Sequence, residues 1–239
     1  MSKRLSLLVL AAAALLPPFL SQSAHAQRRD RLDDPYIAAK LQLGLGGSAE
    51  FSVSREGRTV AQESDIGVSF GAAGQYVHPL HKYFALGGAL GFLTWQSSAG
   101  SDADGGRNFL FDLTAVPQGK FALLDNTLEL YLGLPIGLGL DVLNEVNARS
   151  SVSFPAFGVG AGASVEGDTA IGFVIGVLFG VRYQLLDSLG LLVELGYVYR
   201  TFGHTITTNI GSGGLVAVRN ESDVNVSFGQ FALNLGVYF

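Results

Sequence analysis

The most constraining feature of this chain is a fifteen-residue stretch, 128–142, in which apolar residues alternate with small, polar or charged ones. A repeat of two places the two sets on opposite faces of a β-strand. Because similar segments recur along the chain, the pattern indicates strands with lipid-facing outer surfaces and a more polar interior. The apolar set is Leu128, Leu130, Leu132, Leu134, Ile136, Leu138, Leu140 and Val142, and the intervening set is Glu129, Tyr131, Gly133, Pro135, Gly137, Gly139 and Asp141.

Seven other segments alternate in the same way and are also predicted to be strands. Their apolar positions are assigned to the outer face; over 66–76, for example, Ile66, Val68, Phe70, Ala72 and Tyr76 point outward. The sequence therefore predicts an all-β fold, a closed antiparallel transmembrane β-barrel of eight strands. The predicted strands cover 36–45, 66–76, 84–92, 109–121, 128–142, 171–183, 189–199 and 231–239.

The connections between these segments alternate in length. Short connections at 80–82, 125–126 and 186–188 contain turn-forming residues and predict tight hairpins. The remaining connections are long and are predicted to be loops, at 54–63, 97–107, 144–169 and 204–222. Short turns on one side of the membrane and long loops on the other are typical of membrane β-barrels.

The segment 150–165 is open to two interpretations. It contains regularly spaced apolar residues among glycines, so it could form a hairpin that extends the fifth and sixth strands beyond the membrane. It could instead be an additional spanning strand paired with 205–218, which would give a barrel of ten strands.

Composition supports a membrane protein that crosses with strands. Charged residues make up 15% of the chain, against about 25% in an average protein. Beyond the first 26 residues, no segment has the ~20 uninterrupted apolar residues that a spanning helix needs. Closed β-barrels are the alternative to helices for spanning a bilayer, because they satisfy every backbone polar group internally.

The N-terminal residues have the features of a secretory signal peptide. Lys3 and Arg4 precede an apolar run over 5–20, and the sequence Ala-His-Ala at 24–26 fits a cleavage site. We therefore expect a signal peptide over 1–26, a periplasmic tail over 27–35 and a barrel domain over 36–239. The net charge is −5 and no basic cluster is present, so nucleic acid is not an expected partner. The absence of cysteine excludes disulfides and zinc–thiolate sites.

The C-terminal segment carries the most specific motif. Phe239 is the last residue, and Phe231, Leu233, Leu235 and Val237 alternate before it. This resembles the signal by which the outer-membrane assembly machinery recognises bacterial barrels. With the pattern over 36–239, the chain resembles the small bacterial outer-membrane β-barrels related to the OmpA transmembrane domain, the opacity proteins and OmpX.

That resemblance implies a location and a set of partners. We expect an integral protein of the Gram-negative outer membrane, with both termini in the periplasm and the long loops outside the cell. The implied partners are outer-membrane lipid, lipopolysaccharide, the barrel-assembly machinery and periplasmic chaperones, and the barrel is expected to be monomeric.

If the apolar sets face lipid, eight charged residues face the lumen. We expect them to form a buried network that fills the barrel, although a narrow solute path or proton relay is the alternative. Lys120 and Glu129 flank the turn at 125–126 and should be diagonal neighbours. The predicted set is Lys40, Asp112, Lys120, Glu129, Asp141, Arg182, Glu194 and Arg200.

Aromatic residues gather near both ends of the predicted strands, as in the interfacial girdles of membrane barrels. The set expected at the periplasmic boundary is Tyr36, Tyr76, Tyr83, Phe84, Phe121, Tyr183 and Phe239. The set expected at the outer boundary is Phe92, Trp95, Phe109, Tyr197, Tyr199 and Phe202.

Three functions are compatible with these features. The leading hypothesis is a non-catalytic barrel with a structural or loop-presenting role, without cofactor or metal. The second is a narrow channel for small or apolar solutes. The third is a lipid-modifying enzyme in which His204 activates Ser222 with help from Glu221 or Asp223, although no spacing motif supports this arrangement.

Overall fold

A computed structural model describes residues 34–55, 58–95, 107–124, 127–143, 146–148, 163–166, 169–186, 188–212 and 215–239. All of them belong to one compact unit, Leu32–Phe239. The predicted signal peptide, most of the predicted periplasmic tail and residues 97–106 of the predicted loop over 97–107 lie outside the described residues. In the described part, every regular element is a β-strand.

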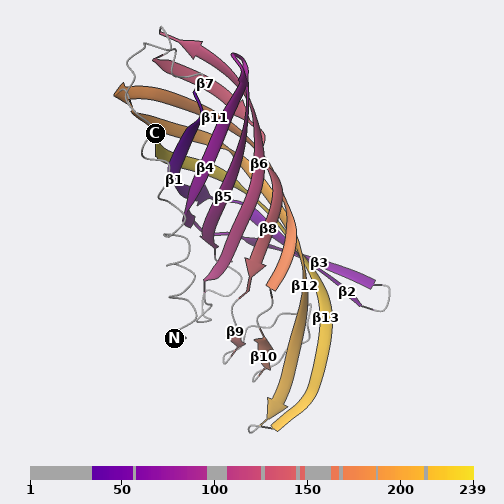
Figure 1. Ribbon diagram of the computed structural model, residues 1–239. Coiled ribbons are helices and arrows are strands. Elements are labelled where there is room, and N and C mark those ends of the chain that lie inside the picture. The colour runs from indigo at the N-terminus through magenta and orange to yellow at the C-terminus, as the bar shows by residue number, and fades with distance from the viewer. Residues whose placement is uncertain are drawn as a thin grey trace. The chain divides into compact units, whose positions relative to one another are not determined.

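Eight spanning segments pair in an antiparallel ring, which confirms the predicted fold class. The ring runs β1–β4–β5–β6–β7/β8–β11–β12–β13, and β13 pairs with β1 to close it. Figure 1 shows these strands side by side, with β12 and β13 continuing well past the end of β8. The bounds are β1 Tyr36–Leu45, β4 Ser69–His81, β5 Phe84–Trp95, β6 Asn108–Leu123, β7 Leu128–Gly133, β8 Ile136–Val142, β11 Thr169–Leu186, β12 Leu189–Ser212 and β13 Leu215–Tyr238.

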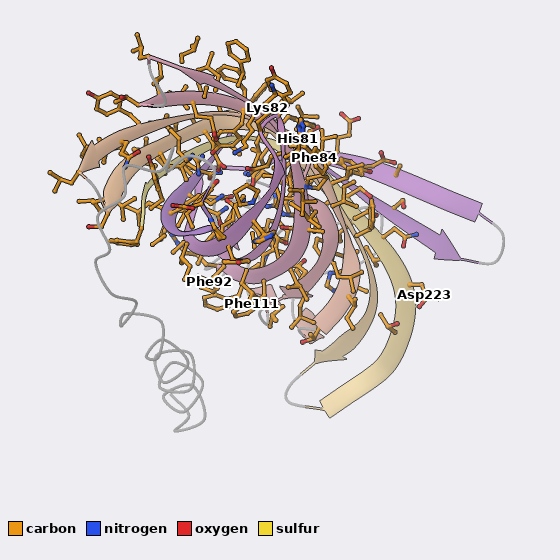
Figure 2. The ribbon with its side chains drawn as sticks, turned by 45° about the horizontal axis from the view of Figure 1, so that its top comes forward. His81, Lys82, Phe84, Phe92, Phe111 and Asp223 are labelled. Atoms are coloured by element: carbon orange, nitrogen blue, oxygen red, sulfur yellow. The ribbon has the colours of Figure 1, made fainter. Side chains whose placement is uncertain are left out.

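The outer face of the ring is apolar, as the alternation predicted. Along β11, for example, Ile171, Phe173, Ile175, Val177 and Phe179 are all exposed, while the residues between them point inward. Figure 2 shows Phe92 and Phe111 beside one another. They lie on the neighbouring strands β5 and β6, and their ring centroids are 5.1 Å apart. Because so many large apolar side chains would be costly to expose to water, this belt is suited to a hydrocarbon environment.

The fifth spanning segment contains a break that the alternation did not predict. The stretch over 128–142 is divided into β7 and β8 at Leu134 and Pro135. Pro135 accepts a hydrogen bond from the Gly176 N–H at 2.9 Å, and Pro117 accepts one from the Leu134 N–H at 3.0 Å. Proline has no N–H with which to return either bond, so the ladder is weakened on both sides of the break.

At the end opposite the tight turns, the sheet continues as paired extensions of the spanning strands. β2 (Ser48–Arg55) pairs with β3 (Arg58–Asp65) and also with β13. β9 (Val146–Ala148) pairs with β10 (Ala163–Glu166), which pairs with β12. We call this end of the barrel the hairpin end, and the end with the tight β4–β5, β6–β7 and β11–β12 connections the turn end.

These extensions correct two predicted loops and show where the described end of the segment 150–165 lies. The predicted loops over 54–63 and 204–222 form strands wherever they are described, because both backbones find pairing partners beyond the ring. β9 and β10 lie in line with β8 and β11, so the described part of 144–169 is the hairpin extension and the ring keeps eight strands. Residues 149–162 lie outside the described residues.

The predicted outward orientation of Ile66 is wrong. Ile66 lies between β3 and β4, next to the junction of β1 and β2. Ile66 is 3% exposed and points inward, whereas Val68 points outward, so the alternation slips between β3 and β4. The connection between β1 and β2, which pairs with Ile66, bends at Gly46 and Gly47, whose φ angles are +60° and +120°. Glycine adopts such angles without the penalty that other residues pay, and the Ile66 N–H donates to the Gly47 carbonyl across this bend.

Three aromatic residues assigned to the interfacial girdles instead fill the lumen. Trp95 and Phe202 are buried at the hairpin end, and Tyr36 is buried at the turn end. Each has inward parity on its strand, and that parity outweighs its position near a strand end. Trp95 and Phe202 join an apolar cluster that we call the plug, which comprises Ala49, Ile66, Leu93, Trp95, Leu110, Ala170, Phe202, Val224, Val226 and Phe228.

Candidate functional site in the barrel lumen

The eight charged residues expected in the lumen all point inward and are at most 9% exposed. Their strands bring them there because each occupies the parity opposite the apolar outer set. They fall into four groups, arranged from the turn end to the hairpin end.

The first group surrounds Glu129 near the turn end. Arg182 lies directly opposite Glu129 in the β7–β11 register, and its Nη2 is 2.7 Å from Glu129 Oε1. Lys120 Nζ lies 3.8 Å from Glu129 Oε2, so the two expected neighbours are close. The Arg182 guanidinium also lies over the Tyr36 ring, 4.0 Å from its centroid, and 5.1 Å from that of Tyr238. Two cations thus face the Glu129 carboxylate, and two aromatic rings pack against the Arg182 guanidinium.

The second group is centred on Glu194. Lys40 Nζ lies 2.9 Å from Glu194 Oε2 and donates to Gln75 Oε1 at 2.6 Å. The Tyr131 hydroxyl donates to Glu194 Oε1 at 2.7 Å, and Asn234 Nδ2 donates to Oε2 at 2.8 Å. Both carboxylate oxygens therefore have donors, which offsets the cost of burying the charge.

The third group is a pair that bridges opposite walls of the barrel. Arg200 on β12 donates through Nε at 3.1 Å and Nη2 at 2.8 Å, and both bonds reach Asp112 Oδ2 on β6. β6 and β12 are not neighbours in the sheet, so this contact crosses the lumen.

The fourth group lies within the plug. Asp141 is fully buried; its Oδ1 accepts from Trp95 Nε1 at 2.9 Å, and its Oδ2 lies 3.2 Å from His204 Nε2. These contacts join β5, β8 and β12 around the lumen. The sequence did not single out Trp95 or His204 as partners of Asp141, although the parity of each strand indicates that all three face inward.

The structure excludes Asp223 as the acid that orients His204 in the predicted catalytic triad. His204 is 1% exposed and points into the lumen, whereas Asp223 is exposed on the outer side of β13. Asp223 accepts a hydrogen bond from the Thr205 hydroxyl at 3.2 Å. Because His204 and Asp223 point to opposite faces of the sheet, they cannot act as a pair. The side chains of Glu221 and Ser222 lie outside the described residues.

Two glycines make room for tyrosines inside the lumen. A Cβ at Gly180 would lie 2.1 Å from Tyr131 Cζ, and a Cβ at Gly190 would lie equally close to Tyr238 Cζ. Only glycine lets these rings lie flat against the wall. The Tyr131 ring is thereby placed to donate to Glu194.

The motif that resembles an assembly signal lies on the outer face. Phe231, Leu233, Leu235 and Val237 have the outward parity of β13, and Phe239 follows directly after that strand. Phe231 and Phe239 are well exposed. His78 and His81 are exposed near the turn between β4 and β5, where Figure 2 shows His81 beside Lys82. Among the described residues, no group of three or more metal-binding side chains is close enough to hold an ion. The same part of the chain has no helix long and apolar enough to cross a membrane.

Comparison with known proteins identifies the fold. No protein-family model matches the chain, and no curated protein matches it. The outer membrane protein OprG from Pseudomonas aeruginosa is 12% identical with a TM-score of 0.52, and the match covers 86% of this chain and 94% of OprG. The outer membrane protein AlkL is 15% identical with a TM-score of 0.43, covering 94% and 96% of the two chains. Ail from Yersinia pestis is 14% identical with a TM-score of 0.37, covering 86% and 99%.

The chain therefore has the fold of a small bacterial outer-membrane β-barrel. At these identities the likeness concerns the fold alone, so it assigns no activity.

Proposed function

We propose that this protein is a non-catalytic integral barrel of the bacterial outer membrane that holds a rigid set of hairpins outside the cell. Its apolar belt would lie in lipid, the turn end would face the periplasm, and the hairpin end would project outward. The periplasmic orientation of the turn end rests on the usual asymmetry of such barrels, which have short turns inside and long connections outside.

The observation that carries this proposal is the burial of the lumen. Arg182, Tyr36 and Glu129 are buried at the turn end, and Trp95 and Phe202 are buried at the hairpin end. A continuous aqueous path would leave such inward side chains in contact with water. An eight-stranded barrel is also only wide enough for its own side chains.

A rigid lumen suits the presentation of surface structure. β12 and β13 pair continuously from the turn end to Ser212 and Leu215, so the outer hairpin is a direct continuation of the barrel wall. β2 and β3 continue β1 and β4 in the same way. The outer hairpins therefore inherit their orientation from a wall that buried charge pairs hold in place.

Single-channel recording in planar bilayers tests the proposal. The refolded protein should insert without producing steady conductance steps. Steady, voltage-independent conductance steps from single inserted barrels would instead favour the channel hypothesis and would contradict a closed lumen.

A further inference from the structure

A cavity of about 60 Å³ lies in the middle of the lumen, between the Glu194 group and the Arg200–Asp112 pair. Its wall is mixed in character. Lys40, Gln42, Asp112, Arg200 and Asn234 line it together with small apolar residues of β4, β5 and β13. A buried space needs about 10–15 Å³ on this measure to hold one water molecule, so there is room for a few waters.

Three buried acceptor atoms of the lining residues have no donor among the described residues. They are Gln42 Oε1, Asp112 Oδ1 and Asn234 Oδ1. The other polar atoms of two of these residues are already engaged: Asp112 Oδ2 accepts both bonds from Arg200, and Asn234 Nδ2 donates to Glu194. A buried acceptor without a donor costs about 1–3 kcal/mol, and more when it is charged. A molecule that can donate hydrogen bonds at this place would remove that cost.

We propose that the cavity is an internal hydration site, whose waters donate to Gln42, Asp112 and Asn234 and join the Glu194 group to the Arg200–Asp112 pair. Two observations select water over other donors. Lys40 and Arg200 already neutralise Glu194 and Asp112, so the site offers no uncompensated negative charge to offset the dehydration of a metal or ammonium cation. The volume is also well below the ~150 Å³ of an apolar cavity that admits benzene, so larger solutes are excluded.

The test counts long-lived waters in the full-length protein refolded in detergent, by magnetic relaxation dispersion of water deuterium and oxygen-17 nuclei. The wild type should show a few such waters. Ala232→Leu, which places a side chain in the cavity, should lose them. Ala122→Leu is the matched control, because Ala122 is half-buried and faces inward on β6 but does not line the cavity; it should retain them.

Two further measurements test the proposal. The first uses the wild type alone, and the second depends on whether Ala232→Leu raises or lowers the urea midpoint. A dry apolar cavity takes up xenon, so xenon-129 chemical shifts of the wild type should show no bound population. Ala232→Leu should lower the urea midpoint, because it leaves three acceptors unpaired, whereas filling a dry void would raise it. Absence of long-lived water in the wild type, equal counts in both variants, or xenon in this cavity would each overturn the proposal.

Discussion

At the scale of single residues, the interior depends on carboxylates that have several donors each. Glu129 is held by Arg182, with Lys120 nearby, and Glu194 is held by Lys40, Tyr131 and Asn234. Removing one partner of such a group leaves the others charged and buried. The loss is then dominated by uncompensated charge rather than by the bond itself.

Glu129→Ala should therefore destabilise the refolded barrel by roughly 3–5 kcal/mol, because Arg182 and Lys120 lose their counter-charge. Urea unfolding in detergent or lipid vesicles measures the change. Glu63→Ala is the control: Glu63 is exposed on β3, so its replacement should shift stability by less than about 0.5 kcal/mol. Equal midpoints for the two variants would mean that the Glu129 face is wet.

Trp95 offers a second test at this scale, because it is the only tryptophan in the chain. Its indole lies in the plug and donates to Asp141, so we expect a blue-shifted emission that brominated lipids barely quench. A control variant with Trp95→Phe and Tyr199→Trp places the only indole on the exposed outer face, where the same lipids should quench it strongly. Strong quenching of the native Trp95 would mean that its side chain lies in the interfacial girdle and would contradict its place in the plug.

At the scale of elements, alternation predicted the strands well and their ends poorly. Period two determines which face a residue occupies, so the inward parity of Lys40, Asp112 and Arg200 could be read directly from the sequence. It carries no information on partners across the lumen: Lys40 and Glu194 are 154 residues apart and lie on strands separated by β13. The extended hairpins were missed because their sequences lack the long apolar alternation of the spanning strands, and their pairing depends on neighbours far away in sequence.

The break at Pro135 gives a prediction for the fifth spanning segment. Pro135→Ala supplies the N–H that the ladder lacks, so it should stabilise the barrel by about 1 kcal/mol, a typical value for one hydrogen bond. The urea midpoint should rise. Ala115→Pro, which removes a donor from the continuous strand β6, should lower it. A midpoint that falls for Pro135→Ala would show that packing of the proline ring outweighs the missing bond.

At the scale of the whole molecule, the two faces of the sheet are suited to different surroundings. The outer face is apolar around the ring, and the inner face holds paired charges, tyrosines and the plug. A polar, closely packed interior and an apolar exterior are both explained if the spanning strands lie in a bilayer. The same placement underlies the proposed presentation of the hairpins.

The most direct measurement is a spin-label scan along β11 in lipid vesicles. The chain has no cysteine, so single cysteines at positions 171 to 179 carry unique labels. At odd positions, labels should collide freely with oxygen and hardly at all with a water-soluble nickel complex, because these side chains face hydrocarbon. At even positions labels should be poorly accessible to both reagents, and a label at Asp223 should be accessible to nickel. Nickel accessibility at the odd positions as high as that at position 223 would place the apolar face in water and contradict the account.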